Sequence, residues 1–196
     1  MNKITLRGVF TNVKPSHKIK DIEYDQANLL VPRKDGKEDI VSLKFKKFSN
    51  KYNENTEIEL TGNIRSYSRK LDNGKNKVSL YVFTYFDVPE DDTVNNVKID
   101  GRICKIEPVR KTVNGKTNIH FILANNLVTD SEQKLNSYIP CIAWGKLAKE
   151  LSLLSVNTLL EIEGELHSRE YKKKINEEEF EIRVAHELVV TSFEVK

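Results

Sequence analysis

The sequence predicts an all-β protein with short helices, built as two tandem five-stranded barrels. The first observation is an internal repeat: residues 4–15 (ITLRGVFTNVKP) match residues 97–108 (VKIDGRICKIEP), and residues 55–66 match residues 157–168. A repeat of this length is too long for a solenoid unit and long enough for a small domain. The second observation is an alternation of apolar and polar residues within each copy, which is typical of strands.

The alternating segments follow the same order in both copies. In the first half they read ITLRGVF, DIVSLKF, EIELTGNI and KVSLYVF, and in the second half VKIDGRI, HFILA, YIPCIAW, LLEIEGEL and FEIRVAHELVV. Three dipeptides favour tight hairpin turns: Asp35-Gly36, Asn73-Gly74 and Asn114-Gly115. Helical spacing is found in GKLAKELSLL at 145–154 and, more weakly, in KKFSNKY at 46–52.

Five strands with a helix between the third and the fourth is the plan of the OB-fold, a barrel that binds oligonucleotides or oligosaccharides on one face. Gly8 and Gly101 lie inside the first strand of each copy, and Gly62 and Gly164 inside the fourth. We interpret these glycines as places where a barrel strand bends and not as a phosphate-binding loop. The predicted domains are residues 1–90 and 97–196, joined by a short acidic linker at 91–96 that keeps them close together.

Composition excludes several other classes of protein. The chain has 196 residues and a formal net charge of +3, and it has neither an apolar run long enough to cross a membrane nor a secretory leader, so we expect a cytoplasmic protein. Cys104 and Cys141 have no partners at metal-ligand spacing, so we expect reduced thiols and neither a metal nor a cofactor. Four scattered histidines and the absence of any nucleophile or phosphate-binding motif argue against an enzyme.

Several motifs in the second half resemble the bacterial single-stranded DNA-binding proteins. They are SYIPCIAWGKLAKEL at 137–151, EIEGELHSREY at 161–171 and the closing strand AHELVVTSFE at 185–194, and the resemblance covers most of residues 95–194. The first half carries only the skeleton of this pattern, and the internal repeat extends the resemblance to it. The resemblance implies a protein that coats and protects single-stranded DNA without strong sequence preference in replication, recombination or DNA transfer.

The resemblance also implies a set of binding residues in the second half. Aromatic side chains of this family stack on bases while cations follow the phosphates, which assigns stacking to Trp144, Tyr138 and Tyr171. The cations expected to contact phosphates lie on the hairpin between the last two strands. They are Arg169, Lys172 and Lys173. A flat aromatic ring suits any base, at about 1 to 3 kcal/mol per stacked base. The alternative for Trp144 is that its ring caps the barrel core beside the helix.

The corresponding binding residues of the first half follow from the repeat. Phe45 is placed at the position of Trp144, with Lys44 and Lys46 on either side, and the hairpin supplies Arg65, Tyr67, Arg69 and Lys70. Asp39 is placed at the position of Tyr138, and Arg69 at that of Tyr171. We therefore expect the first domain to depend more on charge and the second more on stacking.

The expected partners are single-stranded DNA and a second copy of the chain. Proteins of this family usually carry one OB domain, assemble as tetramers and end in a flexible tail whose acidic tip recruits replication proteins. This chain ends in VVTSFEVK, so recruitment of replication or transfer proteins by an acidic tip is in doubt, and a homodimer would reproduce a set of four OB domains. A tail-less tandem form suits a phage, plasmid or other mobile element. The alternatives are a protein-interaction module of a primosome or conjugation complex, and an RNA-binding protein.

Overall fold

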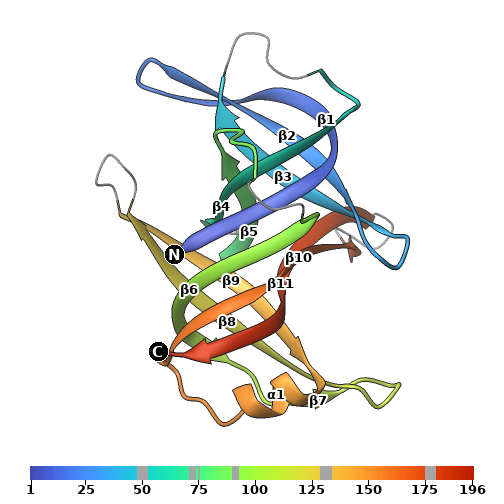
Figure 1. Ribbon diagram of the computed structural model, residues 1–196, viewed down its shortest axis with the longest axis vertical. Coiled ribbons are helices and arrows are strands. Elements are labelled where there is room, and N and C mark those ends of the chain that lie inside the picture. The colour runs from blue at the N-terminus through green and yellow to red at the C-terminus, as the bar shows by residue number, and fades with distance from the viewer. Residues whose placement is uncertain (48–52, 71–73, 75, 90–92, 129–133, 175–179) are drawn as a thin grey trace.

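The protein forms two closed β-barrels, seen one above the other in Figure 1. The structure is a computed structural model that describes residues 1–47, 53–70, 74, 76–89, 93–128, 134–174 and 180–196. The first barrel contains β1 (Asn2–Ile19), β2 (Ile22–Pro32), β3 (Glu38–Lys46), β4 (Thr56–Lys70) and β5 (Asn76–Thr84). The second contains β6 (Asn95–Ile106), β7 (Arg110–Lys111), β8 (Thr117–Val128), β9 (Lys134–Trp144), α1 (Gly145–Leu151), β10 (Leu159–Lys174) and β11 (Phe180–Val195). The predicted all-β, two-barrel fold is confirmed.

Both barrels close in the same way. The first ring runs β1-β2-β3-β5-β4 and returns to β1, and the second runs β6-β8-β9-β11-β10 and returns to β6. One parallel pair completes each ring, β3 with β5 and β9 with β11, while the other neighbours within each ring are antiparallel. The predicted helix at 145–154 is α1, which buries Ala148 and Leu151. The weaker helix predicted at 46–52 falls largely outside the described residues.

The glycines inside the strands stand where two strands cross too closely for a side chain. A Cβ atom on Gly8 would lie 2.2 Å from the carbonyl oxygen of Leu30, and one on Gly101 would lie 2.6 Å from that of Ala124. Real Cβ atoms do not approach backbone this closely, so an alanine would force the strands apart. The structure therefore supports the barrel interpretation of these glycines.

A short antiparallel ladder between β1 and β6 joins the two barrels. Ile4 pairs with Val97 at its centre, and Asn2 and Leu6 pair with Ile99 and Asn95 on either side. These residues are equivalent in the internal repeat, so the ladder has approximate two-fold symmetry about Ile4 and Val97. The two strands run side by side across the middle of Figure 1 and make one continuous eleven-stranded sheet.

A second pair of contacts between the barrels obeys the same symmetry. On one side, the Ser66 hydroxyl accepts a 2.8 Å hydrogen bond from the Tyr138 amide, and the Ser66 amide donates to the Ser137 hydroxyl at 3.3 Å. On the other side, the Ser168 hydroxyl accepts a 2.8 Å hydrogen bond from the Ile40 amide, and the Ser168 amide donates to the Asp39 carboxylate. In both joints, a serine on the fourth strand of one barrel is hydrogen-bonded to the third strand of the other.

Asp39 adds a charge to only one of these two joints. Its carboxylate is fully buried and accepts hydrogen bonds from two nitrogens of Arg33, one of them at 2.6 Å. Arg33 also donates to the backbone carbonyl of Ser168 at 2.6 Å. A buried ion pair thereby connects the β2–β3 turn of the first barrel to β10 of the second.

The pairing of strands corrects the predicted equivalence of the two copies by one residue. Leu30 and Ala124 both lie over an in-strand glycine, and their ladder partners are Ile40 and Tyr138. Tyr138 therefore corresponds to Ile40 and not to Asp39, and six positions later Trp144 corresponds to Lys46 and not to Phe45. Because side chains alternate between the two faces of a strand, a slip of one residue moves each of them to the opposite face.

Phe45 accordingly points into the first barrel. Its side chain is only 6% exposed, and its ring packs against Phe86 at 4.8 Å and Phe10 at 6.0 Å between centroids. The prediction that Phe45 stacks on a base is therefore wrong, because the ring lies in the hydrophobic core and not on the outer face of β3.

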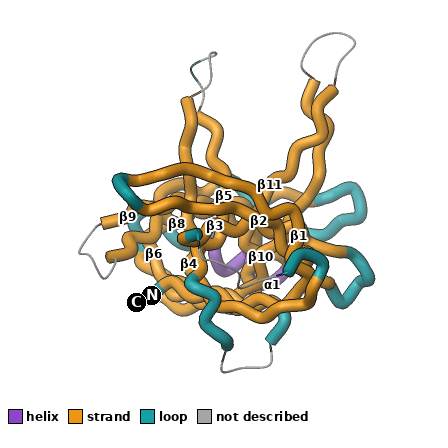
Figure 2. Tube along the Cα trace, turned by 90° about the horizontal axis from the view of Figure 1, so that it is seen from above, coloured by secondary structure: helices purple, strands orange, loops and turns teal. Residues whose placement is uncertain are grey.

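Two long hairpins project from the same side of the molecule. Figure 2 shows the β4–β5 and β10–β11 hairpins rising next to each other.

No helix among the described residues is long and apolar enough to cross a membrane. The second barrel begins with β6 at Asn95, two residues before the predicted boundary.

Replacing Asp39 with Asn should lower the free energy of unfolding by about 3 kcal/mol, because the Arg33 guanidinium would then lie half-buried without its counter-charge. Burial alone would raise the pKa of Asp39, but hydrogen bonds from Arg33 and the Ser168 amide outweigh it and hold the pKa below the ordinary 3.8. This stabilisation is therefore complete above pH 3.8 and declines as the pH falls through the lowered pKa. Urea unfolding at several pH values measures both effects.

The matched control for Asp39 is Ser137→Ala, at the uncharged joint that the two-fold symmetry relates to it. Loss of one neutral hydrogen bond should cost about 1 kcal/mol and leave the acid dependence of stability unchanged. If Asp39→Asn retained both the stability and the acid dependence of the unaltered chain, the ion pair would have no role in joining the barrels.

Replacing Phe45 with Ala should lower the free energy of unfolding by about 3 to 5 kcal/mol, because it leaves a cavity between Phe10 and Phe86. Lys46→Ala, one residue further on β3, should leave stability within about 0.5 kcal/mol because its side chain lies on the outer face. Thermal unfolding of both variants checks the register. Equal losses of stability would contradict it.

Candidate nucleic-acid interface

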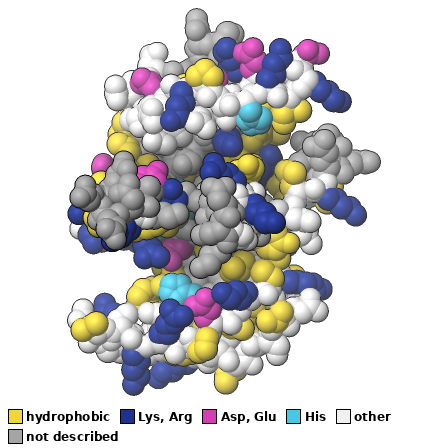
Figure 3. Space-filling view, turned by 180° about the vertical axis from the view of Figure 1, so that it is seen from behind, with side chains coloured by type: hydrophobic (Ala, Val, Ile, Leu, Met, Phe, Trp, Pro, Cys, Tyr) yellow, Lys and Arg dark blue, Asp and Glu magenta, His cyan; other side chains and the backbone are white. Residues whose placement is uncertain are grey.

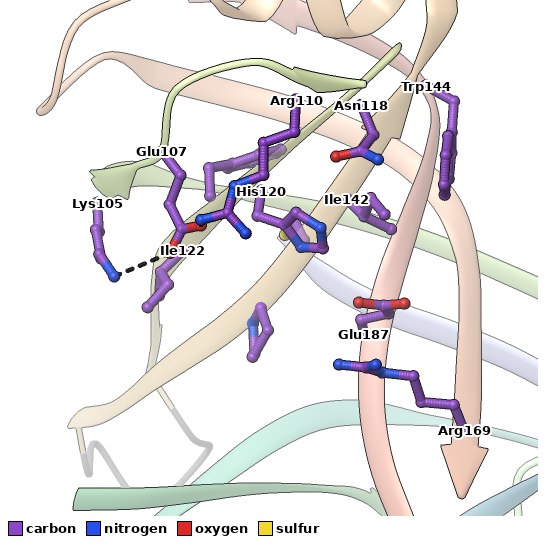
Figure 4. Close-up of a pocket in the computed structure, with 13 residues that line it drawn as sticks. Lys105, Glu107, Arg110, Asn118, His120, Ile122, Ile142, Trp144, Arg169 and Glu187 are labelled. Carbon is purple, nitrogen blue, oxygen red and sulfur yellow. Dashed lines mark hydrogen bonds and ion pairs between the residues drawn. The ribbon is translucent and has the colours of Figure 1, made fainter. Parts of the chain in front are cut away.

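An open groove of about 600 Å³ lies along the outer face of the second barrel. We name it the second-barrel groove, and Figure 4 shows the side chains around it. It is lined by Lys105, Glu107, Arg110, Asn118, His120, Phe121, Ile122, Pro140, Cys141, Ile142, Trp144, Arg169 and Glu187.

Trp144 and Asn118 form one end of the second-barrel groove. They are direct partners in the β8–β9 ladder, and Figure 4 shows both at the same end. The Trp144 side chain is 39% exposed, so the interpretation of this ring as a buried core cap is not supported. The Asn118 side chain is 7% exposed, and its Oδ1 atom is buried and has no hydrogen-bond partner in the described part of the chain.

The cations of the second-barrel groove lie close to carboxylates. Glu107 accepts one hydrogen bond from Lys105 at 3.1 Å, and its other carboxylate oxygen lies 3.0 Å from Arg110. The hydrogen bond from Lys105 is the main reason that the pKa of Glu107 lies below its ordinary value. Arg169 points toward Glu187 on the neighbouring strand in Figure 4. The net positive charge of this groove is therefore small.

A second open groove, of about 500 Å³, lies on the outer face of the first barrel. The start of β9, at residues 135–137, forms one of its walls, so the second barrel completes this first-barrel groove. The other lining residues are His17, Ile19, Lys20, Ile22, Tyr24, Lys44, Lys46, Arg65, Ser66, Tyr81, Phe83 and Tyr85.

Cations and aromatic rings alternate in the first-barrel groove. The Lys44 ammonium lies 4.7 Å from the centre of the Tyr81 ring, and the Arg65 guanidinium lies 3.9 Å from the centre of the Phe83 ring. Both arrangements are cation–π contacts. No carboxylate is found among the described residues that line this groove, in contrast to the second barrel.

His17 and Tyr24 form a stacked pair at the edge of the same groove. Their ring centroids are 4.7 Å apart, and the planes differ by 4°. Burial and the positive charge of Lys44 both lower the pKa of His17, so this ring is neutral near pH 7. It therefore adds a flat surface to the groove and no charge.

The structure brings some of the predicted binding residues together and separates others. Trp144 and Arg169 meet in the second-barrel groove, and Lys44, Lys46 and Arg65 meet in the first-barrel groove. Tyr138 is 44% exposed on the outer face of β9 but lies outside the groove lining. Exposed positions on the two projecting hairpins are occupied by Tyr67, Arg69, Lys70, Tyr171 and Lys172, while the side chain of Lys173 lies outside the described part.

Sequence reasoning missed the aromatic residues of the first-barrel groove. Tyr24 comes from β2, while Tyr81 and Phe83 come from β5 and Tyr85 follows it. Tyr81, Phe83 and Tyr85 recur at every second residue, a spacing that puts them on one face of a strand. These alternating aromatic residues are the sequence pattern from which the aromatic side of the groove could have been predicted. The first barrel therefore has more aromatic surface than the sequence analysis expected.

The face opposite to that of Figure 1 presents basic side chains over both barrels. Figure 3 shows Lys and Arg there in greater number than Asp and Glu. Among the described residues, no group of three His, Cys, Asp or Glu side chains is placed to hold a metal ion. The chemistry available on this surface is that of aromatic rings, cations, fewer carboxylates and uncharged polar groups.

Two solved structures that match the whole chain are of a single-stranded DNA-binding protein. The wild-type protein from Thermus aquaticus matches with a TM-score of 0.72 at 16% identity, covering 100% of this chain and 93% of that chain. A deletion variant of the same protein matches with a TM-score of 0.72 at 17% identity, covering 100% of this chain and 94% of that chain. At these identities the likeness shows the fold.

The family is shown by the sequence itself. No curated protein sequence matches the chain significantly. The model of the single-strand binding protein family, however, matches residues 94–194, which is more than half of the chain and covers the second barrel from β6 to all but the last residue of β11. The chain therefore belongs to the single-strand binding protein family.

Proposed function

We propose that this protein coats single-stranded DNA without strong sequence preference, in replication, recombination or DNA transfer, and that each barrel binds the strand in its own groove. One observation carries the two-groove proposal. Among the described residues, only two buried side-chain polar atoms lack a hydrogen-bond partner, and they are Arg65 Nε in the first-barrel groove and Asn118 Oδ1 in the second. Buried polar atoms in folded proteins almost always have a partner, so one unpaired polar atom in each groove supports a ligand site in both.

The chemistry of the two grooves suits a single strand of any sequence. Every base has a π face that can stack on Trp144 in one groove and on Tyr85 in the other. Cations beside these rings neutralise phosphates, which gives affinity that does not depend on sequence. Neither process changes a covalent bond, so the protein acts by binding and not by catalysis.

The arrangement of the barrels supports a single ligand that spans both. The start of β9 walls the first-barrel groove, and the two projecting hairpins place further aromatic and basic residues on one side of the molecule (Figure 2). An OB barrel occupies roughly 4 to 16 nucleotides, so two barrels require about 10 to 30. A homodimer would bring four barrels into one assembly.

Binding is tested by titrating the full chain with dT30 and dT10. Trp144 is the only tryptophan, so quenching of its fluorescence reports on the second-barrel groove, while anisotropy of labelled DNA reports total binding. We expect dT30 to bind more tightly than dT10 and log affinity to fall with log salt, with a slope near −0.7 per phosphate contact. No change in either signal at low salt would contradict the proposal, and tighter binding of rU30 than of dT30 would redirect it to RNA.

Replacing Trp144 with Ala should weaken binding of dT30 by about 1 to 3 kcal/mol, because one base loses its stacking surface. The ring is partly exposed, so the melting temperature should change little. Affinity and melting temperature are measured together on the same preparation. Unchanged affinity combined with a stability loss of about 3 to 5 kcal/mol would return this ring to the barrel core.

A further inference from the structure

Arg65 occupies an unusual environment in the first-barrel groove. One face of its guanidinium lies on the Phe83 ring, with 3.9 Å between the guanidinium carbon and the ring centroid. The phenol groups that interact with it most strongly belong to Tyr81 and Tyr85. Its Nε atom is buried and donates to nothing among the described residues. The guanidinium is therefore held flat and in place while part of its donor edge remains unused.

Among the described residues that line the groove, no negative side chain balances this guanidinium. The described residues that line the first-barrel groove include Lys44 and Lys46 and no carboxylate. Burial lowers the pKa of Arg65, but an arginine stays protonated at any physiological pH. A partly buried positive charge without a counter-charge is costly, and an anionic ligand would remove that cost.

The second barrel provides an internal comparison at the same positions. Three residues beyond the β4 glycine stands Arg65, and three residues beyond the β10 glycine stands His167. The His167 Nε2 atom lies 2.9 Å from a carboxylate oxygen of Glu165, so this position already has an anionic neighbour. Glu187 and Ile142 stand where the first barrel has Tyr81 and Lys44. The unbalanced cation is thus a feature of the first barrel only.

We propose that Arg65 anchors one phosphodiester group of the bound single strand, which makes the first-barrel groove the principal electrostatic site of the protein. Stacking on Phe83 fixes the guanidinium plane, so its N–H groups point along that plane, and its two terminal nitrogens can donate together to two phosphate oxygens. Lys44 and Lys46 flank the site and add charge. This inference rests on the proposed function.

The test compares three variants of the full chain for binding to dT30 across a range of salt concentrations. Arg65→Gln should weaken binding at low salt and reduce the magnitude of the salt slope by about 0.7, the value for one lost phosphate contact with a single strand. Arg65→Lys keeps the charge but loses the planar fork, so it should bind more weakly than the unaltered chain with a nearly unchanged slope. Arg102→Gln removes a guanidinium of β6 that bonds to the Asn157 carbonyl outside both grooves, and it should change neither quantity.

A second oligonucleotide separates phosphate from base recognition. Arginine also binds guanine through two acceptors on the base edge, so dT30 is compared with a 30-mer in which every third thymine is replaced by guanine. A phosphate anchor predicts the same fold loss for Arg65→Gln on both oligonucleotides. A loss confined to the guanine-containing strand would overturn the proposal in favour of base reading.

The outcomes distinguish this inference from the proposed function. If the unaltered chain did not bind dT30 at low salt, the proposed function itself would fail. If the unaltered chain bound but Arg65→Gln kept the full salt slope, only the phosphate anchor would fail. Should Arg65→Gln not fold, which its melting curve reports, Arg65→Lys decides: binding as tight as that of the unaltered chain would overturn the fork-shaped phosphate contact.

Discussion

The antiparallel ladder between β1 and β6 is the constraint on which the rest of this structure depends. Because Ile4 and Val97 occupy its centre, the two barrels are related by an approximate two-fold axis. That symmetry brings Ser66 against the start of β9 and Ser168 against the start of β3. It also lets the two long hairpins project from one side. The positions of both grooves follow from this one pairing, since each groove is built on the outer face of a barrel that the ladder has oriented.

Between the two copies the inner positions of the strands stayed apolar, while the outer positions changed in character. The in-strand glycines cannot change, because a Cβ atom would strike the backbone of the next strand. Core positions tolerate only apolar residues that fill the barrel. Outward positions on the same strands carry no such restriction, so Lys46 corresponds to Trp144 and Arg65 to His167. Two grooves of different chemistry have thereby formed on one scaffold.

Much of the fold could be predicted from the sequence, because its strongest signals are local. The repeat, the alternation of the strands and the helical spacing of Ala148 and Leu151 all survive in the structure. The strand β2 was harder to find, since Asp25 and Asn28 are residue types that strands usually avoid. The exact alignment of the third strands of the two copies could not be predicted. An alignment that is shifted by one residue still pairs two segments in which apolar and polar residues alternate. This shift of one residue matched Trp144 with Phe45, a core ring, where the structure matches it with Lys46, a cation of the groove.

The first-barrel groove depends on a contact between the barrels, and this is why composition alone could not locate it. Leu135 and Ser137 belong to β9 yet line the groove of the first barrel. In the other direction, Arg33 of the β2–β3 turn and Trp144 of the second barrel both line a further open hollow of about 710 Å³. Arg33 is also the partner of Asp39 in the charged joint. A DNA strand in contact with Trp144 would therefore lie close to Arg33, the side chain that connects the first barrel to β10 of the second.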